Sequence, residues 1–442
     1  MLCAYEITML ESYQKLACIL PAGYELVPEQ LGSGSYGKIY AGIERSTGHQ
    51  VAVKRLYSTG DTSDTTKIVR EALLMRMLAH PNIIAIKDMA MAKYRGDTII
   101  ALVLEFCQTD LFKLIKSPQI LTTEHLQYFL SQMLDALAHM HSHQIIHRDI
   151  KSSNILLNRD CSLKIGDFGL SRAYYDEAGK FYRQQTSTVV TLNYRSPELL
   201  TNGHAGKMND VWGIGCVFSE LLTRTTPFFY TKGLTEIQLM RLILDLLGTP
   251  KREECQWIIN QSTLDYVTQY ASHSPHIMRQ KFQKQSKEEL ELLCKFFQFD
   301  PGKRITAEAA LKDPWLKDFP RHPLTISLMP ETDASSKKDY YNFEDGLDAA
   351  PDKHNAPYLN KLGAQILERE IKRYANPGET LGPLLKDDID SSLTSTKNHV
   401  QNASIASTPS TLFHHEHSED YVKSIPSDKN RSGSTKWSCA VS

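Results

Sequence analysis

The residues best suited to chemistry lie close together in the sequence HRDIKSSN and in the DFG that follows it. Phosphoryl transfer requires a placed hydroxyl, neutralised phosphate oxygens and bound magnesium more than covalent help from the protein. Asp149 can accept or orient the proton of a substrate hydroxyl, and Lys151 can lie against the transferred phosphate as a point charge. Asn154 and Asp167 offer the hard oxygen ligands that magnesium prefers. This spacing predicts phosphoryl transfer from magnesium-bound ATP.

A glycine-rich stretch nearer the start of the chain predicts further phosphate contacts. Gly32, Gly34 and Gly37 let a backbone approach phosphates with no Cβ in the way. A lone pattern of this kind also occurs in dinucleotide-binding folds, where a helix follows it. Here β-like sequence and then the strand-like VAVK follow, which favours a glycine-rich hairpin. In that next strand the small Ala52 leaves room for an adenine ring, and Lys54 reaches the α- and β-phosphates.

Several elements must position these groups. Apolar residues at helical spacing predict a helix over 65–78, and its Glu71 is expected to pair with Lys54 rather than face solvent. The apolar run 99–106 predicts a buried strand, after which Asp110 begins a helix and either contacts ribose or caps the helix. The remaining residues expected around the nucleotide are Leu31, Ile39, Leu104, Glu105 and Cys107.

The second half of the sequence predicts a mostly helical region. A core helix over 124–143 leads into the HRD stretch, and a helix over 211–222 is apolar nearly all round, hence buried. Asp210 is expected to cap that helix and to hold the HRD backbone, while Arg304 is expected to pair with Glu198. The fold class is therefore α+β, with a β-rich part followed by a helical part.

Composition narrows the function classes. The chain has 442 residues, 41% of them hydrophobic, and a net charge of −1, so nothing in the balance calls for nucleic acid. Eight cysteines contain no C-x-x-C pair, which favours reduced thiols over a disulfide or zinc framework. There is no transmembrane-length apolar run, and the first 20 residues predict a short helix packed on the first part of the fold. We expect a monomer in the cytoplasm with access to the nucleus.

The order of these motifs over residues 24–316 resembles a eukaryotic protein kinase. The TDL at 109–111, the LGTP at 247–250 and the insert-like segment after it are similar to the MAP-kinase branch. The NFE at 342–344 and a helix over 359–374 resemble the C-terminal extension of that family, which packs back on the first lobe. The resemblance implies a bilobal fold, ATP and Mg²⁺, protein substrates with Ser or Thr, and activation by an upstream kinase or by autophosphorylation.

The resemblance also sets the expected domain boundaries. They are an N-terminal segment (1–22), an N-lobe (23–105), a C-lobe (106–319) with an insert at about 248–280, an extension (320–380) and a disordered Ser/Thr-rich tail (381–442). Two other protein classes share some of these motifs. A catalytically dead scaffold is disfavoured because Lys54, Glu71, Asp149, Asn154 and Asp167 are all present. A cyclin-dependent kinase is disfavoured because that group lacks the extension.

The activation segment departs from the family pattern. MAP kinases carry Thr-x-Tyr, whereas this chain has TST, with Thr186 retained and Thr188 in the place of tyrosine. In the family, the phosphotyrosine pairs with two arginines that align with Leu192 and Arg195. The tyrosine and one of its two arginines are thus absent together. This is physically reasonable, because an arginine that binds phosphotyrosine is not needed where the tyrosine is absent.

The residues that the family uses to bind phosphothreonine are all kept, namely Arg70, Arg148 and Arg172. A phosphate of charge near −2 at Thr186 is expected to join them and close the lobes. The sequence therefore predicts activation at Thr186, with Thr188 as a second candidate.

Two residues near the end of the segment bear on catalysis and on substrate choice. Thr191 is expected to bridge Asp149 and Lys151 through its hydroxyl group. In proline-directed kinases the equivalent of Arg195 takes up a backbone carbonyl beside the substrate pocket. A proline after the phosphorylated residue then fits, because it has no N–H that needs a partner. The resemblance thus implies Ser/Thr-Pro substrates.

The last four residues, CAVS, fit a C-a-a-X box that would farnesylate Cys439. A coincidental terminal cysteine is the alternative, and both interpretations stay open. Attachment to a membrane is expected only if Cys439 is prenylated, and one lipid gives only marginal binding.

Overall fold

The computed structural model describes residues 13, 16–34, 37–58, 62–94, 97–174, 191–202, 206–271, 276–316 and 356–375. All of them belong to one compact unit that includes Met1–Pro383. The expected phosphorylation sites Thr186 and Thr188, the lipidation candidate Cys439 and the Ser/Thr-rich tail lie outside the described residues.

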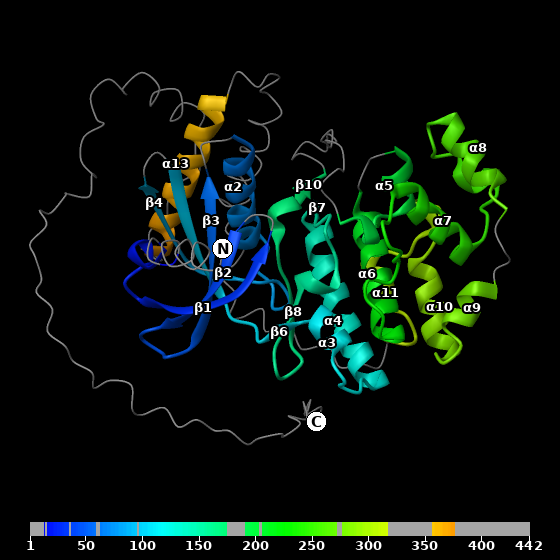
Figure 1. The fold of residues 1–442 in the computed structure, drawn as a ribbon, viewed down its shortest axis with the longest axis horizontal. Helices are drawn as coiled ribbons and strands as arrows, with labels where there is room; N and C mark the ends of the chain where they lie inside the picture. Colours follow the sequence, from blue (N-terminus) through cyan, green and yellow to red (C-terminus); the bar gives the residue numbers. More distant parts are fainter. Residues whose placement is uncertain are drawn as a thin grey trace, which may run out of the picture. The chain divides into compact units, whose positions relative to one another are not determined.

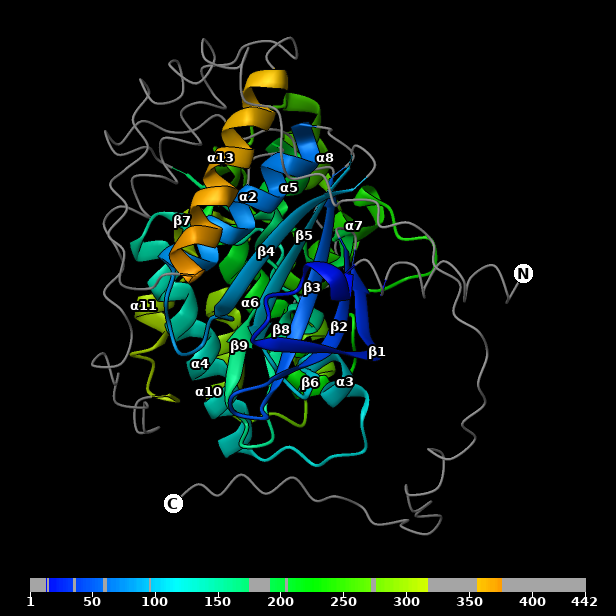
Figure 2. The ribbon, with the colours of Figure 1, turned by 90° about the vertical axis from the view of Figure 1, so that its left-hand side faces the viewer.

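One antiparallel sheet, with strands in the order β1-β2-β3-β5-β4, forms the β-rich first lobe (Figure 2). The strands are β1 (Tyr24–Gly34), β2 (Gly37–Glu44), β3 (Gln50–Ser58), β4 (Ile86–Tyr94) and β5 (Asp97–Glu105). Because successive side chains of a strand point to opposite faces, Val51 and Val53 lie in an apolar cluster on one face of β3. Lys54 points instead to the face where it meets helix α2 (Thr62–Met77). The predicted glycine-rich hairpin is present, because β1 and β2 pair antiparallel with Gly34 opposite Gly37.

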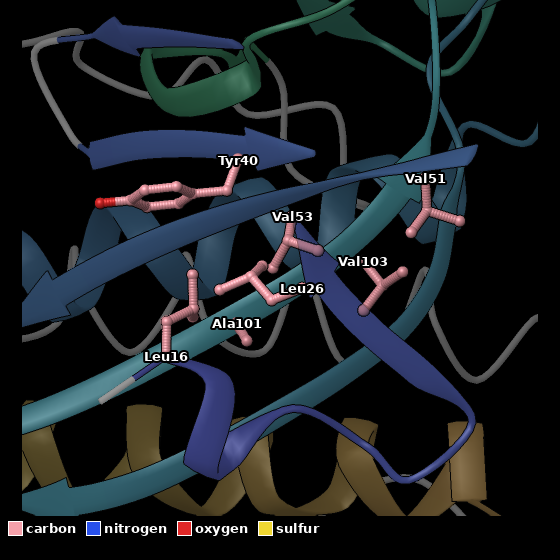
Figure 3. Close-up of a cluster of buried hydrophobic side chains, with 7 residues drawn as sticks. All are labelled: Leu16, Leu26, Tyr40, Val51, Val53, Ala101 and Val103. Carbon is pink, nitrogen blue, oxygen red and sulfur yellow. The ribbon is translucent and has the colours of Figure 1, made fainter. Parts of the chain in front are cut away.

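The described residues of the N-terminal segment pack on the apolar face of this sheet (Figure 3). Leu16, in the helical turn 16–19, is fully buried, and Tyr13 donates a 2.7 Å hydrogen bond to the main-chain oxygen of Leu26. Burying one leucine side chain contributes about 2 kcal/mol. The expected short helix on the first lobe is thus confirmed for residues 16–19. The full cluster is Leu16, Leu26, Tyr40, Val51, Val53, Ala101 and Val103.

Helix α13 (Ala356–Ala375) packs along α2 and β4 (Figure 2). Its Glu370 is almost fully buried and forms an ion pair with Arg76 of α2. Leu367 and Ile366 are buried beside it. The extension therefore returns to the first lobe through this helix, as the resemblance implied.

The second lobe is mostly helical. Its helices are α3 (Leu111–Lys116), α4 (Thr123–Ser142), α5 (Pro197–Asn202), α6 (Lys207–Thr223), α7 (Glu236–Leu247), α8 (Gln261–Gln269), α9 (His276–Lys281), α10 (Lys287–Phe296) and α11 (Ala307–Ala310). Helix α6 is the central one, since it packs against both α4 and α10 (Figure 1). Every residue from Asn209 to Leu222 is buried, which agrees with the apolar pattern of the sequence.

Short strands carry the loops that matter for chemistry. Strands β6 (Thr109–Asp110), β8 (Ile155–Leu157) and β9 (Leu163–Ile165) form one sheet, and β7 (Ile145–Ile146) pairs with β10 (Arg172–Ala173). The β8–β9 hairpin brings the residues after HRD next to those before DFG. The lobes meet here, because Ile84 of the first lobe donates a 2.9 Å hydrogen bond to the main-chain oxygen of Ile165.

Two expectations need correction. Helix α6 begins at Lys207 with Gly206 as its N-cap, so Asp210 lies inside the first turn and does not cap it. Cys161 is disulfide-bonded, so reduced thiols were the wrong expectation for this residue, whereas the other cysteines of the described part of the chain are free. Within the described ranges, no helix combines the length and the apolar character needed to cross a membrane.

Candidate active site

The β3 lysine meets two carboxylates where the lobes join. Lys54 Nζ lies 2.5 Å from Glu71 Oε1 and 3.4 Å from Asp167 Oδ1. Lys54 and Glu71 are both buried, at 7% and 3% exposure, so neither can be satisfied by water. The predicted ion pair between β3 and α2 is therefore present. Since Asp167 shares the lysine, the same contact ties the DFG residues to the first lobe.

Lys54 and Asp167 each favour the charged form of the other. Burial alone would lower the pKa of Lys54, but the carboxylates of Glu71 and Asp167 outweigh burial and raise the pKa above its ordinary value. Burial likewise opposes ionisation of Asp167, but the positive charges of Lys54, His147 and Lys151 prevail and lower its pKa. Asp167 is thus held as a carboxylate, the form that a metal ion needs.

The HRD backbone is anchored to the centre of the second lobe. The carboxylate of Asp210, fully buried in α6, accepts hydrogen bonds from the main-chain N–H groups of His147 (2.8 Å) and Arg148 (2.7 Å). His141 lies 3.2 Å from the same carboxylate. Arg148 itself has a positive φ of 70°, a conformation that L-residues rarely adopt without such support. The expected role of Asp210 in holding this loop is present, although it acts from within the helix.

The catalytic side chains form one hydrogen-bonded group. Lys151 Nζ donates to Asp149 Oδ2 at 2.6 Å and to Thr191 Oγ1 at 3.0 Å. Thr191 Oγ1 in turn donates to Asp149 Oδ1 at 2.9 Å. The bridge that the sequence predicts for Thr191 is therefore present. It fixes the orientation of both oxygens of Asp149, the group that would receive a hydroxyl proton.

Asn154 and Asp167 fit a magnesium site. Asn154 Nδ2 donates to the main-chain oxygen and to Oδ2 of Asp149, at 2.9 and 3.1 Å, which leaves its Oδ1 as the ligand atom. The main-chain N–H of Gly166 donates to the main-chain oxygen of Asn154 at 2.9 Å. This bond brings Asn154 close to Asp167, which follows Gly166. No cluster of three or more His, Cys, Asp or Glu side chains suited to a metal occurs in the described ranges. Magnesium needs none, because it takes one or two protein ligands together with phosphate oxygens.

The glycine-rich hairpin is shaped by two different demands. A Cβ on Gly37 would lie 2.0 Å from the main-chain oxygen of Arg55, so only glycine allows β2 to approach β3 there. A Cβ on Gly32 would meet nothing within 4 Å. Packing therefore explains Gly37 but not Gly32, and open space at Gly32 fits the approach of a phosphate. Gly34 pairs with Gly37 at the turn.

The expected adenine-contacting residues occupy neighbouring strands. Ala52 of β3 lies opposite Ala41 of β2 and Leu104 of β5, and Ile39 lies opposite Lys54. Leu31 lies near the end of β1, next to Gly32. Small and apolar residues thus occupy the strand positions next to Lys54, where the adenine ring is expected.

The side chains of the connector after β5 make structural contacts. Glu105 accepts from the main chain of Ala85 at 2.9 Å and pairs with Lys164 at 2.8 Å. Burial, with the charge of Glu105, raises the pKa of the Cys107 thiol to about 12, so that thiol stays neutral. Asp110 is the N-cap of α3, accepting from the N–H of Lys113 at 2.8 Å. Capping and ribose binding remain compatible roles for Asp110.

The backbone elements that carry the three expected phosphate-binding arginines lie close together. Pairing of β7 with β10 puts Arg172 opposite Ile146, two residues before Arg148. Helix α2, which carries Arg70, packs against Phe168–Leu170 just before Arg172. Arg70 and Arg148 are buried.

The structure also shows two contacts that the sequence did not predict. Arg195 Nη1 lies 2.5 Å from the carboxylate of Glu236 on α7. Tyr194 donates a 2.7 Å hydrogen bond to Glu220, a fully buried carboxyl whose pKa is raised by burial. Ser152 Oγ lies 3.3 Å from the Tyr194 hydroxyl oxygen. The expected pair of Arg304 and Glu198 is present at 2.7 Å. Glu220 and Glu236 lie in no recognised motif. Only the structure of a family relative, in which the equivalent residues lie beside Tyr194 and Arg195, could have pointed to these contacts.

A β-rich lobe that presents a lysine–glutamate pair, joined to a helical lobe with an anchored HRD loop and DFG carboxylate, defines a protein kinase domain. The protein kinase domain family matches residues 26–316 of the chain. Mitogen-activated protein kinase 4a of Physcomitrium patens is 37% identical over 312 residues, covering 69% of this chain and 81% of that protein. Mitogen-activated protein kinase 13 of Arabidopsis thaliana is 37% identical over 311 residues, covering 69% and 83%.

A third relative, mitogen-activated protein kinase 18 of Arabidopsis thaliana, is 38% identical over 318 residues, which cover 71% of this chain and 50% of that protein. The chain belongs to the protein kinase family and, within it, to the MAP kinases. It is an ATP-dependent serine/threonine protein kinase that uses Mg²⁺. This membership implies protein substrates and upstream kinases.

Proposed function

We propose that this MAP kinase phosphorylates Ser or Thr residues that are followed by proline, and that phosphorylation of Thr186 activates it. The observation that carries the substrate proposal is the fixed, nearly buried position of Arg195, four residues after Thr191. An arginine held there can occupy a main-chain carbonyl beside the pocket, so that a substrate N–H finds no acceptor. Proline, which lacks that N–H, then loses nothing on binding.

The residues divide the reaction between them. Lys54 and the backbone of the glycine-rich hairpin hold phosphate oxygens, while Asn154 and Asp167 hold Mg²⁺, which shields the charge at the transferred group. Asp149 orients the substrate hydroxyl, and Lys151 neutralises the transferred phosphate. Thr191 keeps Asp149 and Lys151 aligned through the two hydrogen bonds of its hydroxyl group.

Activation at Thr186 is supported by the grouping of Arg70, Arg148 and Arg172. Arg70 rides on the helix that carries Glu71, and Arg148 precedes Asp149 in the catalytic loop. A phosphate bound by all three would couple the position of α2 to that of the loop. Since α2 supplies the partner of Lys54, the phosphate would also favour the nucleotide-binding arrangement.

Substrate specificity is tested with a peptide library that varies the residue after the phosphorylated Ser or Thr. A higher kcat/KM for proline than for alanine at that position is expected. Equal rates for all residues there would overturn the proline proposal and leave the kinase assignment intact.

Activation is tested with Thr186→Ala beside Thr188→Ala, each assayed after incubation with ATP and with phosphosites mapped by mass spectrometry. Losing a phosphate that makes several charge-assisted bonds should lower activity about 100-fold for Thr186→Ala. Thr188→Ala should change activity much less. Wild-type activity in Thr186→Ala would refute this switch.

A further inference from the structure

The substrate-facing segment, residues 191–196, is tied near its end to helix α7 by an ion pair. Arg195 Nη1 and Glu236 Oε1 are 2.5 Å apart, and the two residues are 41 positions apart in the sequence. The side chain of Arg195 is only 9% exposed, whereas that of Glu236 is 61% exposed. A nearly buried cation is thus compensated, in part, by a carboxylate that reaches it from the surface.

The other end of the substrate-facing segment makes a catalytic contact. Thr191, at its start, is hydrogen-bonded to both Asp149 and Lys151. Between the two ends, Asn193 donates a 2.6 Å hydrogen bond to the main-chain oxygen of Phe229. Any shift of Arg195 therefore acts on a short stretch whose other end touches the reacting groups.

Glu236 is itself held in place. It is the first residue of α7, and Thr235 before it forms a capping box with Gln238, with hydrogen bonds of 3.3 and 2.8 Å. A carboxylate in the first turn of a helix is favoured by the helix dipole. The capping box therefore fixes the start of α7, and with it the position from which Glu236 faces Arg195, without any modification of the protein.

We propose that Glu236 is a positioning residue for peptide substrates: its carboxylate holds Arg195, and through it the 191–196 segment, in the form that receives the residue after the phosphorylated Ser or Thr. The proposal rests on the proposed proline-directed function. In this chain a permanent carboxylate keeps Arg195 in place, so that arginine needs no phosphate of its own. Glu236 acts on substrate binding, whereas ATP binding depends on Lys54, Asp167 and the hairpin, which belong to other elements.

The test compares Glu236→Gln with Glu288→Gln in the full chain. Glu288 is an exposed carboxylate in the first turn of another helix, α10, so its variant reports the general effect of losing such a charge. Steady-state assays would use two peptides that differ only in having Ser-Pro or Ser-Ala. Glu236→Gln should raise KM for the Ser-Pro peptide about tenfold, as expected for losing a charged hydrogen-bond partner, with kcat and the KM for ATP changed less than about twofold. Glu288→Gln should match the wild type.

Two further readouts separate positioning from simple loss of structure. Glu236→Asp, which keeps the charge, should recover part of the peptide affinity. The KM for the Ser-Pro peptide should also rise with salt more steeply in the wild type than in Glu236→Gln, because ions screen an exposed carboxylate. An unchanged peptide KM in Glu236→Gln, or an equal loss in kcat and ATP affinity, would overturn the proposal.

The outcomes also distinguish this proposal from the one on which it rests. If the wild type treats Ser-Pro and Ser-Ala peptides alike, proline specificity fails, while a raised peptide KM in Glu236→Gln would still establish positioning. If the wild type prefers Ser-Pro and Glu236→Gln keeps the same preference and KM, only the role of Glu236 fails.

Discussion

Two loops meet at the hydrogen bond between Asp149 and Thr191, and they are anchored in opposite ways. The catalytic loop is fixed from the interior by Asp210, a fully buried carboxylate that accepts two main-chain hydrogen bonds. The substrate-facing segment, residues 191–196, is fixed at Arg195 by Glu236, whose side chain is 61% exposed. The first anchor is shielded from solvent and salt, and the second is open to both.

The difference separates chemistry from recognition. A misplacement of about 1 Å at reacting groups can cost about 100-fold in rate, so the catalytic loop benefits from an anchor that water cannot reach. The substrate-facing segment must instead receive proteins of different sequence. A surface anchor suffices there, because an ion pair that is open to solvent on one side is weaker than a buried one and permits small adjustments.

The largest effect is expected from breaking the interior anchor. In Asp210→Asn an amide group replaces one of the oxygens that accept from His147 and Arg148, so one buried N–H loses its partner at a cost of about 1–3 kcal/mol. The displaced loop should lower kcat about 100-fold, with a smaller change in peptide KM. Steady-state kinetics and a thermal unfolding curve measure both effects.

A matched control is Asp265→Asn, which removes a carboxylate paired with Arg252 at 3.1 Å on the surface. It should leave kcat and Tm close to those of the wild type. If Asp210→Asn behaved like Asp265→Asn, the interior anchor would have no special importance and the contrast between the two loops would fail.

A smaller effect is expected at the joint between the loops. Thr191→Ala removes the hydroxyl that donates to Asp149 and accepts from Lys151, so kcat should fall about tenfold. Thr191→Ser keeps the hydroxyl and should retain most of the rate. The KM for ATP should stay unchanged in both variants. An equal loss in the Ser and Ala variants would assign the role to the methyl group rather than to the hydrogen bonds.

The same contrast explains what the sequence could predict. Lys54, Asp149, Asn154 and Asp167 lie in dense motifs whose spacing has one good chemical explanation, so their site was predicted. The fold followed from alternation in β3 and from the all-round apolar pattern of α6. The class of fold therefore needed little more than periodicity and order of motifs.

Two polar pairs between distant residues were not predicted. Glu370 meets Arg76 across 294 positions, and Glu236 meets Arg195 across 41. A glutamate at a helix start already has a local explanation as a dipole-stabilising residue, so nothing in the sequence called for a distant partner. The sequence around Asp210 is typical of a helix cap for a similar reason, but α6 begins at Lys207, so Asp210 lies in its first turn.

The smallest effect concerns a buried carboxyl beneath the substrate-facing segment. Glu220 accepts from the Tyr194 hydroxyl at 2.7 Å and from the main chain of Phe228 at 3.1 Å. Burial raises its pKa above the ordinary value of 4.5, although those hydrogen bonds oppose the shift. The segment thus also has an interior contact, which is made by a carboxyl whose ionisation is opposed by burial.

The sign of the pH effect follows from this shift. The folded protein keeps the proton on Glu220 at a pH where the unfolded chain has released it, so folding stability falls as pH rises from about 4.5 through the raised pKa. Glu220→Gln, which is neutral and similar in shape, removes that loss. The Tm of Glu220→Gln relative to the wild type should therefore increase with pH over this range, whereas Glu288→Gln should show no such trend. A Tm difference that stayed constant with pH would mean that Glu220 titrates normally, and the substrate-facing segment would then rest on an interior anchor as permanent as that of the catalytic loop.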